Sequence, residues 1–294
     1  MAMNSNMERL LPILVHIQAH LEQDLALNAL AALANLSPYH FHRLFRATVG
    51  ETVKQYVQRL RLEQGAFRLK LHDIPVIDVA FSLGYHSHES FTRAFRKQFG
   101  MPPKAYRRAY HSQRSQPNAS GRLPVLNHAA TNAAFSKVRI QRLESITVAF
   151  IRHLGAYTDA DVGAFDTLIA WAMATGRYKG ENWLLGIGHD DPTVTPPAKV
   201  RFDACLQVNE AFSPAGVIGC QRLPAGDYAA ITYVGPYGSA MYGAYAAIFA
   251  YMQSRPDYTL LGLPAMEIYR TTRVNPNYAL NHTEILLPVA KKGV

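Results

Sequence analysis

The stretch from Ile77 to Arg107 constrains the fold of this chain more than any other part of the sequence. A short apolar run ends at Gly84, and Ser87 follows as a residue type that accepts a free amide where a helix begins. Apolar residues such as Phe91 and Phe95 then recur at helical spacing, while the other side of the helix is basic and polar. The pattern predicts a helix-turn-helix, in which one side of the second helix packs into a domain and the other can enter a DNA groove.

The same pattern occurs earlier in the chain, 50 residues upstream. The matched pairs are Leu33 with Leu83, Ser37 with Ser87, Phe41 with Phe91, Arg43 with Arg93, Phe45 with Phe95, Arg46 with Arg96, Gly50 with Gly100, Lys54 with Lys104 and Tyr56 with Tyr106. Shared apolar residues alone would fit any two helix pairs, but the shared arginines and the shared glycine favour duplication of one module. We therefore expect helix-turn-helix motifs at residues 25–46 and 75–97, with Asp24 capping the first helix of the first motif.

Residues 52–71 predict one long helix between the two motifs, with Val53, Tyr56, Leu60 and Phe67 on its buried side. About 20 helical residues extend for about 30 Å, which is close to one turn of B-DNA at about 34 Å. The spacing predicts two recognition helices in successive major grooves, read by a single chain. A bend in the connecting helix would defeat this arrangement.

The charge distribution agrees with binding to double-stranded DNA. The net charge is +9, and most of the excess lies in the first 115 residues, together with the two motifs. Cys205 and Cys220 form neither a disulfide framework nor a metal-binding spacing, so we expect no metal, no cofactor and a reducing compartment. No apolar run reaches membrane-spanning length, and the N-terminus lacks a signal pattern. We expect a soluble, cytoplasmic protein with no membrane partner.

Residues 7–110 resemble the DNA-binding domain of the AraC/XylS family, whose signature is similar to IDVAFSLGYHSHESFTRAFRKQFGMPPKAYR. The resemblance implies that outward residues of both recognition helices touch bases. The matching positions are Tyr39, His42 and Arg43 in the first helix, and His88, Glu89, Ser90, Thr92 and Arg93 in the second.

The chemistry of these side chains supports part of this assignment. Arginine can bind guanine edges or phosphates, and Glu89 would repel a phosphate but can accept from cytosine N4. For His42 and His88, base contact and simple solvent exposure remain equally open. The cations expected to bind phosphates are Arg46, Arg96, Lys97, Lys54 and Lys104.

The second half of the chain has a different pattern. Residues 111–135 are rich in Ser, Gln, Asn, Ala and Pro and predict a flexible linker. Strands are predicted at residues 138–143 and 147–154, and a helix at 165–174. A second repeat then appears 80 residues downstream, where Gln141-Arg142-Leu143 recurs as Gln221-Arg222-Leu223 and Tyr157 matches Tyr237. We expect a multidomain chain: an all-α N-terminal domain, then an α+β domain at 136–290 made of two pseudo-twofold strand–strand–helix repeats that share one sheet and leave a cleft.

A ligand site is predicted in this cleft. The aromatic candidates are Phe150, Tyr157, Trp171, Trp183, Tyr237 and Tyr269. Most aromatic residues in any domain belong to its core, but Glu267 and Glu284 lie in predicted strands, either at an exposed edge or as counter-charges in a pocket. An aromatic cage with a carboxylate suits a cationic, flat or amphipathic ligand. The Asp190-Asp191-Pro192 sequence predicts a structural loop in preference to a metal site.

Residues 136–290 are also similar to the GyrI-like effector-binding domain, through segments such as IRHLGAY, RLPAGDYAAITYVGPY, PAMEIY and HTEILLPV. The resemblance implies a small-molecule effector held between the two halves by Tyr, Trp and Glu. Fusion to a DNA-binding domain implies a ligand-responsive transcriptional regulator and no enzyme, with RNA polymerase as a further candidate partner. The alternative is a small-molecule hydrolase fused to a DNA-binding domain, with Glu267 as the general base.

Overall fold

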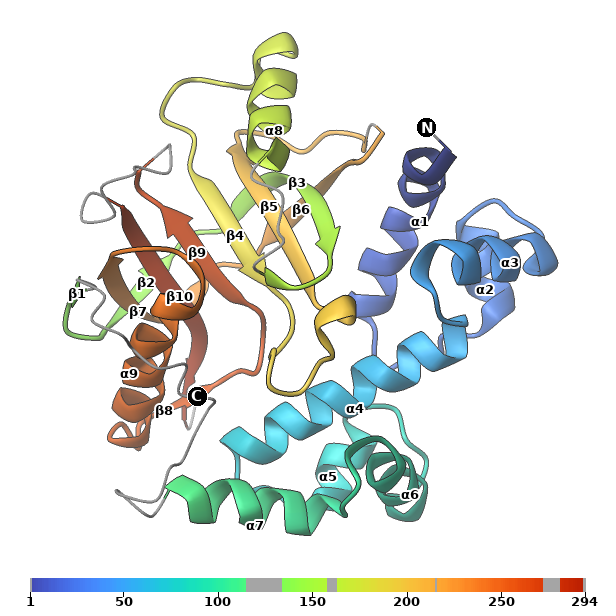
Figure 1. Cartoon of the computed structure of the whole chain (residues 1–294), viewed down its shortest axis with the longest axis vertical. Helices are drawn as coiled ribbons and strands as arrows, with labels where there is room; N and C mark the ends of the chain where they lie inside the picture. Colours follow the sequence, from blue (N-terminus) through green and yellow to red (C-terminus); the bar gives the residue numbers. More distant parts are fainter. Residues whose placement is uncertain (1, 115–133, 158–162, 215, 272–280, 293–294) are drawn as a thin grey trace. The chain divides into compact units, whose positions relative to one another are not determined.

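The structure is a computed structural model that describes residues 2–114, 134–157, 163–214, 216–271 and 281–292 (Figure 1). The chain divides into two compact units. The first unit, within residues 1–123, is helical where it is described, and the second unit, within residues 124–294, is built on one sheet where it is described. None of the helices in the described ranges combines the length and apolarity needed to cross a bilayer.

The helical unit is made of seven helices among the described residues. They are α1 (Ala2–Ala19), α2 (Leu27–Leu33), α3 (Pro38–Val49), α4 (Val53–Leu71), α5 (Val76–Phe81), α6 (His88–Phe99) and α7 (Pro103–Arg114). We call α2 and α3 the first module, and α5 and α6 the second module. Residues of α1, such as Leu14 and Ile17, share a buried core with Phe41 and Phe45 of the first module. Helix α7 was not predicted from the sequence.

The predicted duplication is confirmed in the second helix of each module. Ser37 Oγ accepts a hydrogen bond from the His40 amide at 3.3 Å, and Ser87 Oγ accepts one from the Ser90 amide at 3.1 Å. Gly50 and Gly100 end the helices in left-handed conformations, with φ of 76° and 73°. The aromatic cores also correspond, because Phe45 meets Tyr56 edge-on at 5.5 Å and Phe95 meets Tyr106 edge-on at 5.3 Å.

The first helix of each module follows the repeat less closely. Helix α2 begins after Ala26, which has no side-chain cap, so the predicted cap by Asp24 is wrong. Leu33 is 54% exposed, although its counterpart Leu83 is fully buried. The turns that follow these two helices also differ. The residue with a left-handed backbone is Asn35 in the first module, whereas in the second module it is Gly84, which aligns with Ala34.

The predicted connecting helix is confirmed as α4, a single uninterrupted helix of 19 residues, or about 28 Å. A capping box fixes its start, with Thr52 Oγ1 accepting from the Gln55 amide and Gln55 Oε1 accepting from the Thr52 amide. Gly65 lets the second module pack closely, since a Cβ there would lie 3.1 Å from the Leu83 and Phe91 side chains.

Among the described residues, the second unit is an antiparallel sheet with two α-helices. Its strands are β1 (Ala134–Phe135), β2 (Arg139–Leu143), β3 (Ile146–Leu154), β4 (Leu184–Gly188), β5 (Arg201–Val208), β6 (Ile218–Leu223), β7 (Gly226–Val234), β8 (Tyr258–Leu260), β9 (Ala265–Tyr269) and β10 (His282–Lys291), and its helices are α8 (Gly163–Ala174) and α9 (Tyr242–Gln253). Short 3₁₀ turns occur at Pro197–Lys199 and Gly238–Met241. The expected repeat is therefore present as β2–β3–α8 and β6–β7–α9.

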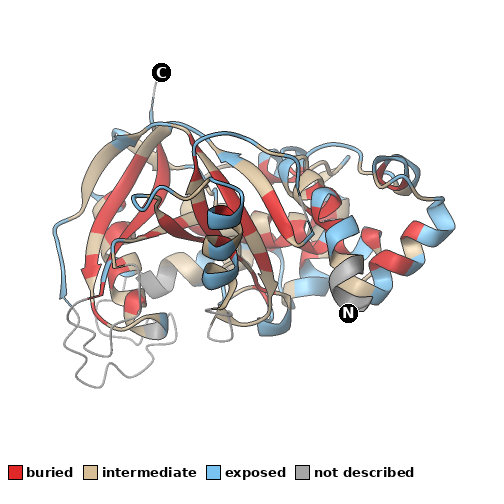
Figure 2. Cartoon of the chain, turned by 90° about the horizontal axis from the view of Figure 1, so that it is seen from above, coloured by how far each residue is buried: buried red, intermediate tan, exposed pale blue. Residues whose placement is uncertain are grey.

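The two repeats share one ten-stranded sheet because they exchange their first strands. The order is β1-β7-β10-β9-β4-β5-β3-β6, with β2 paired to β7 and β8 paired to β10. Thus β2 of the first repeat pairs with the second repeat, and β6 of the second repeat pairs with β3 of the first. The halves meet where β4 pairs with β9. Buried residues run along these strands (Figure 2).

Both helices lie on one face of the sheet. Helix α9 packs on Ile231 and Ile285, and α8 brings Phe165 against Tyr269, with ring centroids 5.7 Å apart. Directly paired residues of antiparallel strands point to the same face, and Ile285 is paired with Glu267. Glu267 therefore belongs to the face that α8 and α9 cover.

Candidate functional site

The outward surfaces of α3 and α6 carry the residues expected to contact DNA. The exposed residues are Tyr39, Arg43 and Arg46 on α3, and Glu89, Arg93, Arg96 and Lys97 on α6; the partly buried ones are His42, His88, Ser90 and Thr92. Phe41, Phe45, Phe91 and Phe95 on the opposite sides of these helices are fully buried. Each helix thus has an anchored back and a polar front.

Some of these polar groups are already engaged by the protein. Ser90 Oγ donates to the Ser87 carbonyl at 2.8 Å. The Thr92 hydroxyl oxygen is buried and has no hydrogen-bond partner among the described residues. Hydrogen bonds from its own amide and from Ser87 lower the pKa of the exposed Glu89 carboxyl, so this residue presents a full negative charge. On α3, the Arg43 guanidinium lies 5.7 Å from the centre of the Tyr39 ring.

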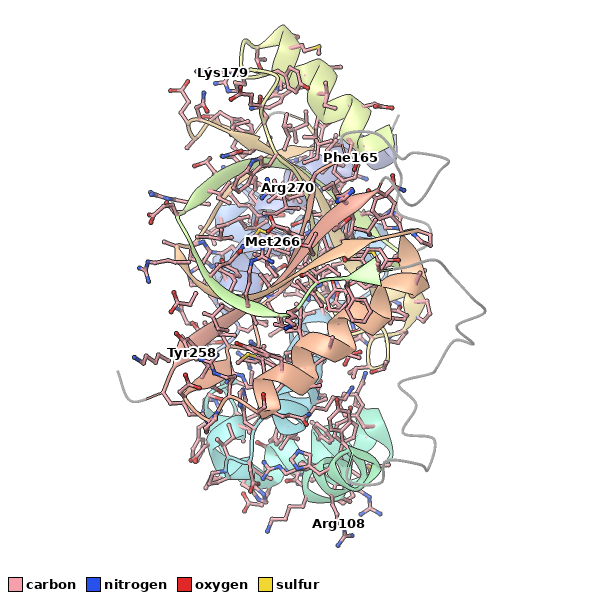
Figure 3. All side chains as sticks on the ribbon, turned by 90° about the vertical axis from the view of Figure 1, so that its left-hand side faces the viewer. Arg108, Phe165, Lys179, Tyr258, Met266 and Arg270 are labelled. Carbon is pink, nitrogen blue, oxygen red and sulfur yellow. The ribbon has the colours of Figure 1, made fainter. Side chains whose placement is uncertain are left out.

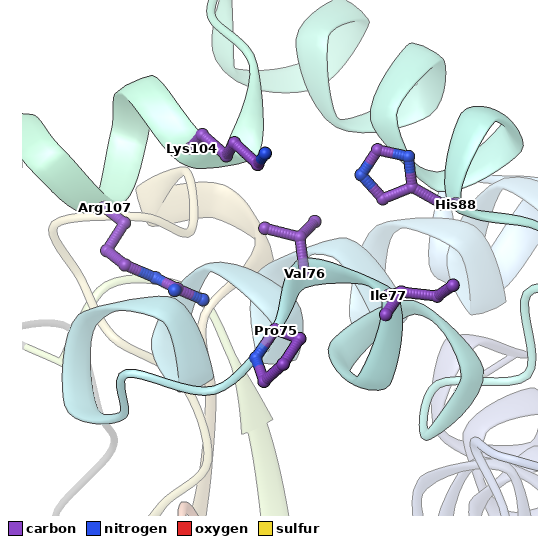
Figure 4. A pocket seen from close by; sticks show the side chains of 6 residues that line it. All are labelled: Pro75, Val76, Ile77, His88, Lys104 and Arg107. Atoms are coloured by element: carbon purple, nitrogen blue, oxygen red, sulfur yellow. The ribbon is translucent and has the colours of Figure 1, made fainter.

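A hollow of about 410 Å³ opens beside the start of α6. It is lined by Pro75, Val76, Ile77, His88, Lys104 and Arg107 (Figure 4). The Arg107 guanidinium donates to Asp73 at 3.0 Å and to the Ile74 carbonyl. Lys104 is exposed, so its ammonium group stands at the edge of the second module, next to the recognition helix.

In the second unit, Glu267 is the centre of a group of tyrosines. Its Oε1 accepts a hydrogen bond from Tyr245 Oη at 2.6 Å, and its Oε2 accepts one from Tyr269 Oη at 2.8 Å. Gly186 of β4 lies directly opposite Glu267. A Cβ at Gly186 would collide with the Tyr269 hydroxyl and would come within 2.7 Å of the Phe202 ring.

Further aromatic side chains surround these groups. Tyr237 contacts the Tyr269 ring edge-on at 5.5 Å. Phe165, labelled in Figure 3, contacts the same ring from α8. Burial raises the pKa of Tyr157 and Tyr242, and nearby carboxylates, Glu267 among them, add to the increase. We call Glu267, Tyr157, Tyr237, Tyr242, Tyr245, Tyr269 and Phe165 the tyrosine–glutamate cluster.

Burial sets the protonation of this cluster. The residue Glu267 is partly exposed, but its carboxyl group is buried. Burial raises the pKa of this carboxyl, and the hydrogen bonds from Tyr245 and Tyr269 offset only part of the increase. Burial, and then the Glu267 charge, raise the pKa of Tyr245 and Tyr269 well above the ordinary value. Both hydroxyls therefore stay protonated and act as donors, which leaves the carboxylate as the only anion of the hydrogen-bonded trio.

Three of the predicted lining residues lie on the opposite face of the sheet from Glu267. Glu284 is paired with Ile268, so it faces away from Glu267. It accepts hydrogen bonds from both Arg139 and Arg270, and it is therefore an ion-pair partner in a second cluster. The Arg270 guanidinium lies 4.6 Å from the Trp183 ring centre, which places Trp183 there as well.

Phe150 also belongs to the opposite face. It is 1% exposed and paired with Cys205, whose neighbours on that face include the buried Arg152–Asp203 ion pair. Trp171 is separate again, since its ring contacts Phe212 at 4.6 Å. Of the aromatic candidates, Tyr237 and Tyr269 lie beside Glu267. Tyr157 lies on the same face of the sheet, over Gly188, and its hydroxyl donates to the Asp190 carbonyl.

The predicted loop at Asp190-Asp191-Pro192 is confirmed as structural. The Asp190 carboxylate accepts from the Arg201 amide at 2.7 Å and from its guanidinium at 2.6 Å and 2.9 Å. Asp191 Oδ1 accepts from the amide and hydroxyl of Thr193. In the parts of the chain that the structure describes, His, Cys, Asp and Glu nowhere form a group of three or more suited to a metal ion.

Sequence profiles of two families match the two units. The profile of a helix-turn-helix domain matches residues 30–109, and that of the GyrI-like small molecule binding domain matches residues 136–290. The chain belongs to the GyrI-like family and carries an AraC-type helix-turn-helix domain. The second match covers more than half of the chain and contains the whole tyrosine–glutamate cluster.

Relatives of the AraC-type domain are regulators or DNA-binding proteins by name. Right origin-binding protein of Escherichia coli K12 is 37% identical over 97 residues, which cover 33% of this chain and 34% of that protein. The matched segment thus spans about a third of that relative's length. Regulatory protein SoxS of the same strain is 33% identical over 95 residues, covering 32% of this chain and 89% of SoxS.

The chain also has similarity to solved structures. The DNA-binding domain of AdpA in complex with a target DNA is 33% identical, covers 36% of this chain and 96% of its own, and gives a TM-score of 0.35. The EcmrR–DNA complex is 14% identical, covers 90% of this chain and 99% of its own, and gives a TM-score of 0.43.

Three members of the tyrosine–glutamate cluster were not predicted from the sequence: Phe165, Tyr242 and Tyr245. The 80-residue repeat relates two of them, because Tyr245 occupies the position that matches Phe165. Both side chains contact the Tyr269–Glu267 pair, one through its ring and the other through its hydroxyl. Tyr157 and Tyr237 also occupy matched positions, but only Tyr237 contacts the Tyr269 ring, whereas the Tyr157 hydroxyl donates to the Asp190 carbonyl at 2.7 Å. The pseudo-twofold symmetry thus builds one site from matched positions.

Proposed function

We propose that this protein is a sequence-specific transcriptional regulator that reads two successive major grooves and responds to a small cationic or amphipathic ligand. The observation that carries the DNA-reading part is the duplication: two capped helices, each with a buried aromatic back and an exposed polar front, are joined by the unbroken α4. The names of the relatives, which describe DNA-binding and regulatory proteins, support the same role.

The residues divide into two kinds of contact under this proposal. Arg43 and Arg93, exposed at matched positions of α3 and α6, suit base edges. Lys54 and Lys104, exposed in the first turns of α4 and α7 just after the recognition helices, suit phosphates. Glu89 carries a full charge and would face a cytosine amino group.

The ligand part rests on the tyrosine–glutamate cluster of the GyrI-like domain. One carboxylate among protonated tyrosines and a phenylalanine provides both a counter-charge and aromatic faces for an organic cation. Both Glu267 oxygens are held by tyrosine hydroxyls, which favours holding a charge over activating a water. Ligand binding would alter DNA affinity or contact with RNA polymerase, and such a regulator would act in the cytoplasm.

The proposal is tested by selecting sites from random DNA with the full chain and then footprinting the best site. We expect two protected major-groove patches about one helical turn apart, within a footprint of about 20 base pairs. Protection without sequence preference would contradict sequence-specific reading. Turnover of a bound ligand by the purified chain would instead favour the hydrolase alternative.

A further inference from the structure

Arg61 of α4 connects the two modules of the AraC-type domain. Its Nε donates a hydrogen bond to the Leu21 carbonyl at 2.7 Å, and its Nη2 donates to the Gln23 carbonyl at 2.6 Å. Its Nη1 donates to the Gly84 carbonyl at 3.4 Å. Leu21 and Gln23 lie between α1 and α2, whereas Gly84 lies in the turn between α5 and α6. One planar guanidinium therefore binds backbone that precedes one recognition helix and backbone that precedes the other.

The carbonyls that Arg61 binds belong to well-anchored segments. The Leu21 side chain is buried in the same core as Leu30 and Phe41 of the first module. Gly84 follows Leu83, which is fully buried in the second module. Displacement of either carbonyl would require a shift of the module to which it is attached.

The turn of the second module also comes close to the segment before α2 at this point. A Cβ at Gly84 would lie 2.8 Å from Arg61 Nη2 and 2.8 Å from the Glu22 carbonyl oxygen. Gly84 has a φ of +73°, which an L side chain rarely adopts. The matched position in the first module is Ala34, with a φ of −82°. Glycine is thus required in the second module, where the turn meets Glu22 and Arg61.

A second contact restrains the same junction. Arg68, two turns further along α4, donates to Ser82 Oγ at 2.5 Å, just before the Gly84 turn. Arg68 holds the second module to α4, while Arg61 also reaches the segment before α2. Arg61 is therefore placed to determine how the two modules are separated and rotated.

We propose that Arg61 is a positioning residue that sets the half-site spacing the chain reads, without itself touching DNA. The inference rests on the proposed reading of two grooves. Each inserted base pair moves the second half-site by about 3.4 Å and by about a tenth of a turn. A junction held by three hydrogen bonds from one guanidinium cannot follow that movement, whereas a junction without them can.

The test measures the affinity of the full chain for its selected site and for versions with one base pair inserted or deleted between the half-sites. The wild-type chain is expected to lose about tenfold or more in affinity on either change. Arg61→Ala is expected to bind the original site a few-fold more weakly and to distinguish the three spacings by less than about threefold. Arg61→Gln, which keeps a single short donor, is expected to fall between them. Circular dichroism checks that each variant is folded.

Arg108→Ala serves as the charge-matched control, because Arg108 is an exposed arginine of α7 (Figure 3). It should keep the wild-type discrimination even if its affinity falls. If Arg61→Ala does not fold, Gly84→Ala perturbs the same junction from the other side and should also relax the discrimination. Unchanged spacing discrimination in folded Arg61 or Gly84 variants would overturn this inference and leave the two-groove reading intact. A wild-type chain indifferent to spacing would overturn both the two-groove reading and this inference.

Discussion

Gly186 lies directly opposite Glu267 where β4 pairs with β9, at the junction of the two repeats. The missing side chain of Gly186 leaves the space into which the Tyr269 hydroxyl reaches to donate to Glu267. The two halves contribute differently, since one supplies the Glu267 carboxylate and the other, through Gly186, leaves the space that the Tyr269 hydroxyl occupies. The proposed ligand site thus depends on a residue that has no side chain.

Gly186→Ala is expected to raise the pKa of Glu267 further. The added methyl group must displace Tyr269, whose hydrogen bond lowers that pKa. The crowding should also destabilise the domain by about 1–3 kcal/mol. NMR of carboxyl-labelled glutamate and urea unfolding measure the two effects. Gly226→Ala is the matched control, because nothing lies within 4 Å of a Cβ there. If the pKa stays unchanged while Tyr269→Phe raises it, Tyr269 does not depend on Gly186.

Glu267→Gln should weaken binding of aromatic quaternary ammonium compounds without changing DNA affinity in the absence of ligand. Loss of a buried counter-charge costs about 2 kcal/mol or more, or roughly 30-fold in Kd. Calorimetry with the full chain measures the ligand, and a mobility-shift assay measures DNA. Glu284→Gln is the control, since Glu284 lies on the other face of the sheet with Arg139 and Arg270. Equal losses in both variants would contradict the placement of the ligand at Glu267.

The affinity for such a cation should rise with pH. Because burial raises the pKa of Glu267, part of the population is protonated above about pH 4.3, the ordinary value. Only the ionised form attracts a cation, so Kd should fall as pH increases through the raised pKa. The folded state binds more protons than the unfolded state in this interval, so the stability should fall with rising pH over the same range. Titrations of wild type and Glu267→Gln test both trends, and the variant should show neither.

The parts of the fold that local chemistry determines could be predicted from the sequence. Ser37 and Ser87 begin the recognition helices, and Gly50 and Gly100 end them, because capping depends on a few adjacent residues. The strand–strand–helix repeat was visible for a similar reason, since duplicated segments preserve local patterns.

Which residues surround Glu267 could not be predicted in full from the sequence, because this depends on the pairing register. Alternation shows which residues of one strand share a face, but only the register relates one strand to the next. Glu284 is paired with Ile268 and not with Glu267, so it points to the opposite face. Tyr245 comes from α9, and its reach to Glu267 depends on how that helix packs on the sheet.

Asp203→Asn should destabilise the GyrI-like domain by about 3–5 kcal/mol, because it leaves a buried arginine without its counter-charge. Burial opposes ionisation of Asp203, but Arg152 and His189 outweigh burial and hold its pKa far below the ordinary range. Its contribution is therefore complete above about pH 4 and declines as the pH falls toward that lowered pKa. Chemical unfolding at neutral pH measures the loss. Asp227→Asn, whose 3.5 Å pair with Arg142 is exposed, should cost less than about 1 kcal/mol. Similar values for both would contradict a structural role for the buried pair.

Arg93→Ala and Lys104→Ala should weaken DNA binding in different ways. Arg93 is exposed on the front of α6, so its loss should cost about 1–3 kcal/mol at one base position and relax specificity there. Lys104 lines the hollow at the start of α6. Its loss should lower the affinity for all DNA sequences alike and reduce the slope of log affinity against log salt concentration by about one. Affinities for a set of single-base variants of the selected site, measured at several salt concentrations, separate the two effects.

Arg43→Ala provides the matched test in the first module and should relax specificity at a base position in the other half-site. If Arg93→Ala lowered all affinities equally, Arg93 would be a phosphate contact, and base reading by α6 would have to come from its other outward residues.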